Sequence, residues 1–236
     1  NSLPLIKSIN TSDVPGFPAS TVEGHRGKIH FAEFESKKIL LFQGRVHFYE
    51  GYHISDCMLP VFIAHHLRCK KLILTNAAGG INSELAPGDL MLDTAFNSMN
   101  IRKELTSLIG LASLEAKNRF ISFPVTALNE TVRRAAAEEN ISLKEGNYWY
   151  TKGPSYETPA EIRMIGKFGG DAVGMSTVHE ATYAEYLGIE TASISCITNY
   201  AAGISDVKLS HNDVTETADR VKLTFERLIK KIIAMA

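Results

Sequence analysis

The sequence predicts an α/β protein: a single domain with a mixed, largely parallel central sheet flanked by helices. Short β-branched or apolar runs alternate with segments of helical spacing along the 236 residues, which is typical of this fold class. The chain shows no internal repeat, low-complexity tract or linker-like stretch, so residues 1–236 are expected to form one domain. The composition, with 44% hydrophobic and 22% charged residues, is that of an ordinary globular protein.

Strands dominate the elements expected in the first half of the chain. They are predicted at four short apolar or β-branched runs: Lys28–Phe34, Lys38–Gln43, Leu72–Thr75 and Asp89–Leu92. The apolar stretch Met58–Leu67 is long enough for a helix, and Pro60 fits only in the first turn of that helix. Arg102–Lys117 has helical composition but weak punctuation, so its boundaries are the least defined.

Two helix starts in the second half carry a capping-box signature, in which a Thr precedes a Glu by three residues. Thr158 and Glu161 form the first signature, with Pro159 at the favoured first helical position. Thr177 and Glu180 form the second. The elements expected in this half are helices after Thr158, at Thr131–Asn140, at Ala181–Leu187 and from Ser210 onward, and strands at Asn147–Lys152 and Ile189–Thr198.

Charge and cysteine content argue against several classes of function. The formal net charge of -1 indicates neither a nucleic-acid-binding surface nor an electrostatic membrane anchor. Cys57, Cys69 and Cys196 show no paired spacing and no histidine at zinc-ligand spacing, which favours reduced thiols, a cytoplasmic location and no metal site. Apolar runs stay well short of the ~20 residues that a membrane span requires.

The segment Gly44–Tyr52 follows an expected strand and carries Arg45, His47 and Tyr49 at alternate positions. In extended geometry these three side chains would point to the same side. Arginine presents a planar fork of donors that suits phosphate oxygens, and histidine adds a further donor. The pattern favours an anion site, although a solvated loop explains the segment equally well when it is taken alone.

Two segments of small residues could bring backbone N–H groups close to an anion. Thr75–Asn82 is expected to be a loop after a buried strand, and it is not a P-loop because no Gly-Lys-Ser/Thr follows. Gly174–Thr177 offers a hydroxyl and unpaired amides at an expected helix N-terminus. Either segment also has an ordinary structural explanation, as a β-loop connection or as a plain N-cap.

A third group of residues suits a flat heterocycle. Tyr156 and Glu157 stand immediately before a capped helix, where a ring can stack on a base and a carboxylate can accept from its N–H groups. Asn199 ends an apolar strand, and its amide can donate and accept at once. Glu157 read alone could equally face solvent. His211, which precedes the last helix, is in isolation more often a capping or surface residue than a ligand.

Taken together, these segments resemble the trimeric purine nucleoside phosphorylase family. The matching segments, in the family's order, are Val22–Gly27, Gly44–Tyr52, Asn76–Asn82, Gly153–Glu161, Asp171–Val178, Ile197–Ser205 and Ser210–His211. The resemblance implies phosphorolysis of purine nucleosides such as inosine and guanosine to the free base and ribose 1-phosphate, in purine salvage. It also implies a homotrimer that uses inorganic phosphate as co-substrate and needs no cofactor.

The resemblance assigns a role to each candidate residue. Phosphate would be held by His25, Arg45, His47, Ser176 and the backbone at Ala77. Ribose would contact Tyr49 and Met175, with His211 near its 5′-hydroxyl. The base would lie against Ala78, Gly79, Tyr156, Glu157 and Asn199. The residues expected to be catalytic are Asn199, Glu157 and His47.

The sequence departs from the family pattern in two places. The family carries a Gly-Ser-Gly loop near its N-terminus that contacts phosphate, and we expect the domain to lack this glycine-rich segment. Thr94–Asn97 stands where the family usually has Asp-His-Ile-Asn. The aromatic residue that the family sends into a neighbouring subunit's site is hard to match, with Phe120 and Phe123 as the candidates.

Two other functions compete with this interpretation. A methylthioadenosine phosphorylase of the same fold usually has an aspartate at the position of Asn199 and a small apolar residue at that of His211, so both residues favour 6-oxopurine nucleosides. A degenerate, non-catalytic nucleoside-binding protein is suggested by the altered middle of the chain. The intact set of Arg45, His47, Glu157 and Asn199 argues against that alternative.

Overall fold

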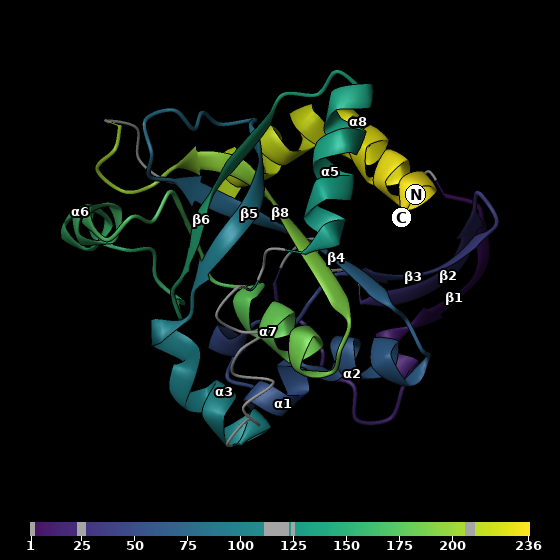
Figure 1. Ribbon diagram of the computed structural model, residues 1–236. Helices are drawn as coiled ribbons and strands as arrows, with labels where there is room; N and C mark the ends of the chain where they lie inside the picture. Colours follow the sequence, from purple (N-terminus) through teal and green to yellow (C-terminus); the bar gives the residue numbers. More distant parts are fainter. Residues whose placement is uncertain (1–2, 23–26, 111–122, 124–125, 206–210) are drawn as a thin grey trace.

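The computed structural model describes residues 3–22, 27–110, 123, 126–205 and 211–236, with side chains from 215 onward in the last range. Its centre is a barrel of five strands in the order β4-β7-β6-β5-β8 (Figure 1). The barrel strands are β4 (Lys71–Gly80), β5 (Leu90–Asn97), β6 (Leu143–Tyr150), β7 (Ala172–Gly174) and β8 (Glu190–Tyr200). The predicted α/β class is thereby confirmed.

The barrel is mixed, as predicted. The β4–β8, β5–β6 and β6–β7 pairs are parallel, while β4–β7 and β5–β8 are antiparallel. Closure into a barrel is the feature that the alternation of strands and helices did not reveal. It depends on which edge strands meet, and the local pattern of a strand carries no information on that pairing.

The segment Thr75–Asn82, expected to be a loop, is strand as far as Gly80. The β4–β8 ladder runs from Lys71 to Gly80, and β7 pairs with the last two residues. A Cβ at Gly80 would lie 3.1 Å from the Ile197 side chain, so glycine lets the strands close tightly here. The small residues therefore serve strand packing rather than a turn.

A second sheet of three antiparallel strands lies beside the barrel (Figure 1). Its strands are β1 (Leu5–Asn10), β2 (Lys28–Phe34) and β3 (Lys37–Gln43), and the short 3-10 helix η1 (Thr11–Asp13) follows β1. Lys37 Nζ donates to the carbonyls of Ile233 and Ala234 at 2.9 and 2.8 Å, which ties this sheet to the end of the last helix. The end of β3 leads directly into Arg45 and His47.

Helices cover the barrel on two sides (Figure 1). They are α1 (Ile54–Cys57), α2 (Leu59–His66), α3 (Arg102–Ile109), α5 (Ala127–Glu138), α6 (Pro159–Lys167), α7 (Val178–Tyr186) and α8 (His211–Met235), with 3-10 helices η2 (Phe48–Glu50) and η3 (Met99–Ile101). Leu128 and Val132 of α5 pack with Leu228 and Ile232 of α8 in one core cluster. In the described residues, no helix is both long and apolar enough to cross a membrane.

The helix boundaries test the capping signals. The box at Thr158 and Glu161 forms as predicted, with Thr158 N–H donating to the Glu161 carboxylate at 2.7 Å. The box at Thr177 and Glu180 does not form, because Thr177 has a φ of 73° and its side chain caps no amide. The helix predicted at Arg102–Lys117 ends at Ile109, where Gly110 takes a φ of 72° and ψ of -155°, a conformation that suits glycine.

Candidate active site

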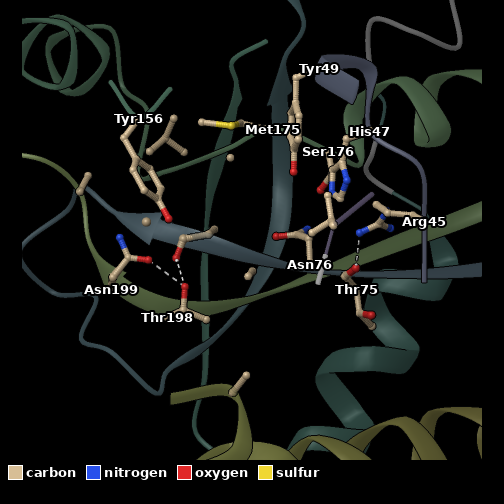
Figure 2. A pocket seen from close by; sticks show the side chains of 18 of the residues that line it. Arg45, His47, Tyr49, Thr75, Asn76, Tyr156, Met175, Ser176, Thr198 and Asn199 are labelled. Atoms are coloured by element: carbon tan, nitrogen blue, oxygen red, sulfur yellow. Dashed lines mark hydrogen bonds between the residues drawn. The ribbon is translucent and has the colours of Figure 1, made fainter. Parts of the chain in front are cut away.

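A cavity of about 480 Å³ lies beside the carboxyl ends of β4 and β8. Strand ends supply Asn76–Gly79 from one side and Thr198 with Asn199 from another. The segment after β3, the segment before α6 and the turn before α7 add to the walls, together with Val22 and with Thr215 and Ala218 of α8. Figure 2 shows Arg45, His47 and Ser176 at one end of this cavity, and Tyr156 with Asn199 at the other.

Arg45, at the first end of the cavity, contacts Thr75 and Glu180. Its Nη1 donates to the Thr75 carbonyl at 2.8 Å, and its Nε lies 3.1 Å from Glu180 Oε2. Both charged side chains are largely buried, at 16% and 6% exposure. Glu180 therefore serves as the counter-ion of Arg45, which explains why it does not complete the predicted capping box. The attraction between the two charges holds the guanidinium beside the cavity.

His47 is oriented by Glu50, a residue that the sequence analysis did not single out. His47 Nδ1 lies 3.1 Å from Glu50 Oε1, and the same oxygen accepts the His47 backbone N–H at 2.7 Å. Burial alone would raise the pKa of the Glu50 carboxyl, but the N–H groups of Thr21 and His47 lower it below its ordinary value. Glu50 is thus an anion that favours the Nδ1–H form of His47 and stabilises its imidazolium.

The pKa of His179 depends on the charges at this end of the cavity. His179 is fully buried behind Arg45 and His47. Burial first, and then the positive charges of Arg45 and His47, lower the pKa of His179 to about 3. His179 therefore stays neutral, and Arg45 and His47 are the groups at this end that can donate to a bound anion.

Ser176 lies in a strained turn at the same end. The Val178 N–H donates to the Ser176 carbonyl at 2.8 Å across Thr177, whose φ of 73° and ψ of -56° define a γ-turn. A β-branched residue in this conformation is costly and persists only where packing enforces it. Thr177 is fully buried, and the Ser176 N–H points to the Tyr148 hydroxyl at 3.4 Å. The turn thus fixes the Ser176 hydroxyl near the cavity.

Tyr49 and Met175 form the middle of the cavity (Figure 2). The Tyr49 ring stacks on His47 with centroids 4.8 Å apart, although η2 replaces the extended geometry expected for this segment. Burial raises the pKa of the Tyr49 hydroxyl, which keeps it protonated and able to donate. Gly153 makes room for both side chains, because a Cβ there would lie 2.5 Å from Met175 Sδ and 3.1 Å from Tyr49 Cδ1.

The far end of the cavity combines an aromatic ring with an amide and a carboxylate. Tyr156 is half-exposed at the rim, and Glu157 Oε1 accepts the Thr151 hydroxyl at 2.5 Å. Asn199 Oδ1 accepts the Thr198 hydroxyl at 2.8 Å (Figure 2). Asn199 Nδ2 donates to the Tyr200 carbonyl at 3.0 Å. These contacts hold the two polar groups in place before any base arrives.

Most of the predicted site residues meet in this one cavity. Those that line it are Arg45, His47, Tyr49, Ala77, Ala78, Gly79, Tyr156, Glu157, Met175, Ser176 and Asn199. His25 lies outside the described residues, as does the side chain of His211, and so does Phe120. Phe123 packs on Phe96 of its own chain, with ring centroids 5.7 Å apart.

The sequence analysis missed the residues that support the site from behind. The sequence pattern assigns Glu180 to a helix cap and does not single out Glu50, Asn76 or Thr198. Glu50 carried a usable signal, because it lies three residues after His47 and such neighbours can pair. Within the described part of the chain, no group of three potential metal-ligating side chains comes together.

The fold and cavity agree with the matches to known proteins. The family model of the phosphorylase superfamily matches residues 2–234, so the chain belongs to that superfamily. Several curated relatives that match most of the chain are named purine nucleoside phosphorylase. The chain is 42% identical over 226 residues to purine nucleoside phosphorylase 1 of Geobacillus stearothermophilus, covering 94% of this chain and 81% of the relative. It is 35% identical to the purine nucleoside phosphorylase of Mus musculus, covering 92% and 78%.

Solved structures give the same result. The Schistosoma mansoni purine nucleoside phosphorylase in complex with inosine superposes with a TM-score of 0.84 at 31% identity, covering 98% of this chain and 85% of that chain. Isoform 2 of the Schistosoma mansoni enzyme, in complex with cytosine and ribose-1-phosphate, has a TM-score of 0.85 at 31% identity, covering 97% and 82%. The family resemblance predicted from the sequence motifs is therefore confirmed.

Proposed function

We propose that this protein cleaves purine nucleosides with inorganic phosphate, releasing the free base and ribose 1-phosphate. The observation that carries the proposal is the polarity of a single cavity. A cationic, donor-rich end formed by Arg45, His47 and Ser176 faces an aromatic and amide end formed by Tyr156 and Asn199. Tyr49 and Met175 lie between them, where a sugar would join phosphate to base.

The reaction follows from the charges that develop. As the N-glycosidic bond breaks, positive charge accumulates on the sugar and negative charge on the departing purine. A phosphate dianion held by Arg45, His47 and Ser176 would stabilise the sugar cation and then form the new bond at C1. The Glu180 and Glu50 carboxylates would keep Arg45 and His47 aimed at the phosphate, since each pair is already formed.

The far end of the cavity would stabilise the departing base. Asn199 can hydrogen-bond the imidazole ring of the purine, where negative charge develops, and Glu157 can accept an N–H from the pyrimidine ring. An amide that both donates and accepts suits a 6-oxopurine. We therefore propose inosine and guanosine as substrates, ahead of 6-aminopurine nucleosides.

The assembly and cellular role extend the proposal. We infer a homotrimer in the cytoplasm that serves purine salvage and uses no cofactor besides its phosphate co-substrate. Exposed apolar side chains near the base end support an interface there. Met99, Met164 and Phe168 are 64%, 47% and 72% exposed, and all three line the groove next to Tyr156.

The test is the phosphate dependence of base release. The protein is incubated with inosine, with and without inorganic phosphate, and hypoxanthine is followed by absorbance. Release should require phosphate, and Arg45→Ala should raise the phosphate KM far more than the inosine KM, because it removes charge-assisted donors. Hypoxanthine release at the same rate without phosphate would contradict the proposal and indicate a hydrolase.

A further inference from the structure

Asp93 of β5 is a fully buried acid inside the barrel that the proposed reaction does not use. Its carboxylate accepts the Ser193 hydroxyl at 2.5 Å and the Ser195 hydroxyl at 2.8 Å, both from β8. Burial raises the pKa of Asp93 to about 7, while the two hydroxyls and the nearby Asn76 amide act in the opposite direction. A buried carboxylate surrounded by donors from two strands can fix the orientation of those donor groups.

Asn76 connects this buried acid to the cavity. In the parallel β4–β8 ladder Asn76 is in register with Ser195, so both side chains face the barrel interior. Asn76 is 8% exposed and lines the cavity, where Figure 2 shows it beside His47 and Ser176. Neither of its amide atoms reaches normal hydrogen-bond geometry with a protein group in the described part of the chain. A buried polar atom without a partner costs free energy, which a hydrogen bond to a bound ligand would recover.

The chemistry of Asp93 determines which amide atom faces the cavity. An ionised carboxylate accepts hydrogen bonds and cannot donate them, so the Asn76 –NH2 group turns toward Asp93. The Asn76 carbonyl oxygen is then left in the cavity wall as a buried acceptor without a protein partner among the described residues. An acceptor repels the oxygens of a phosphate dianion and binds a hydroxyl group. Figure 2 also shows Asn76 between Arg45 at the cationic end and Asn199 at the base end, where the sugar is expected.

We propose that Asn76 is a ribose-binding residue that accepts a hydrogen bond from a sugar hydroxyl, and that Asp93 is the positioning residue that orients it. This inference rests on the proposed function, since it assumes that a nucleoside occupies the cavity. It assigns to the barrel interior a role in recognising the sugar.

The first test compares ligands on Asn76→Ala by titration calorimetry at pH 8, where Asp93 is ionised. Ribose 1-phosphate affinity should fall about tenfold, while the affinities for inorganic phosphate and hypoxanthine stay within about twofold. The affinities for inosine, 2′-deoxyinosine and 3′-deoxyinosine then identify the sugar hydroxyl that Asn76 binds. Asn76→Ala should not weaken the binding of the analogue that lacks this hydroxyl, because removing the hydroxyl and removing the amide delete the same contact.

The second test uses Asp93→Asn, which keeps the shape of the side chain and removes its requirement for donors. Ribose 1-phosphate affinity should fall as in Asn76→Ala, and the double variant should bind no more weakly than Asn76→Ala alone. A purely structural role for Asp93 would instead weaken all three ligands and add to the Asn76 effect, which would overturn the positioning role.

The outcomes also separate this inference from the proposed function. Should the unaltered protein fail to bind inosine, the proposed function itself is contradicted. Should it bind inosine while Asn76→Ala loses affinity for inorganic phosphate rather than for ribose 1-phosphate, only the present inference is overturned. Asn76 would then be a donor to the anion.

Discussion

Replacing Glu50 with glutamine tests whether this carboxylate sets the state of His47. The Glu50 side chain is 1% exposed. One of its oxygens accepts the His47 backbone N–H at 2.7 Å and lies 3.1 Å from Nδ1, and the other accepts the Thr21 backbone N–H at 2.5 Å and hydroxyl at 2.9 Å. Glutamine keeps the shape but offers one acceptor oxygen. Whichever way its amide turns, one backbone N–H then faces an –NH2 group.

The magnitude follows from these contacts. Hydrogen bonds to a charged group contribute about 1.5–3 kcal/mol each, and neutral ones about 0.5–1.5 kcal/mol. Losing one bond and neutralising the others should therefore cost about 3 kcal/mol of unfolding free energy. When His47 Nδ1–H donates to Glu50, Nε2 carries a proton that it can donate to phosphate only if His47 is an imidazolium. Glu50→Gln removes the negative charge that stabilises this imidazolium. We expect the phosphate KM of Glu50→Gln to rise about tenfold or more, equivalent to about 1.4 kcal/mol.

Initial rates at saturating inosine give the phosphate KM, and urea unfolding at pH 7.5 and pH 4 gives stability. The pKa of Glu50 is lowered in the native state, so its contribution is present above its ordinary value of 4.5 and is lost as the pH falls through the native pKa. The stability gap between the two proteins should consequently be largest at pH 7.5 and narrower at pH 4. An unchanged phosphate KM together with the same gap at both pH values would refute the reasoning.

Asn199→Asp should cost about 3 kcal/mol in the barrier for inosine and shift preference toward adenosine, because a carboxylate cannot donate to the 6-oxo group; an unchanged ratio of kcat/KM values for the two nucleosides would contradict this. Gly153→Ala should raise the inosine KM and leave phosphate binding measured by calorimetry unchanged, because its Cβ would lie 2.5 Å from Met175 Sδ at a φ of 66°. Asp93 has its pKa raised from 3.8 to about 7, so the native state binds its proton more tightly and stability should fall by about 1 kcal/mol per pH unit between about pH 4 and 7. The difference in unfolding free energy between the unaltered protein and Asp93→Asn, measured in urea, should therefore change between about pH 4 and 7. A difference that stays constant over this pH range would exclude the titration of Asp93.

Local signals in the sequence predicted what is decided locally. Thr158, Pro159 and Glu161 form the predicted helix start, because every partner in a capping box lies within one turn. The strands β2 and β8 lie where β-branched and apolar runs place them. The motif at Arg45, His47 and Tyr49 follows β3 of the second sheet, and the base-end residues follow β6 or end β8 of the barrel; all of them line one cavity.

Features that depend on distant partners were not predictable from pattern alone. Glu180 has the spacing of a capping residue, yet it forms an ion pair with Arg45, which lies far away in the sequence. Thr177 has a positive φ, although β-branched residues rarely adopt this conformation. Small residues up to Gly80 resembled a loop because their packing against Ile197 appears only once the barrel closes.

The most direct measurement of the central claim uses inosine and phosphate labelled with ¹⁸O at all four oxygens. If the phosphate oxygen held by Arg45, His47 and Ser176 attacks C1 of the ribose, mass spectrometry should show ribose 1-phosphate that retains all four labelled oxygens. Hypoxanthine should appear in equal amount. Hypoxanthine accompanied by unlabelled free ribose would show that water is the nucleophile, and would contradict the assignment of the cationic end of the cavity to phosphate.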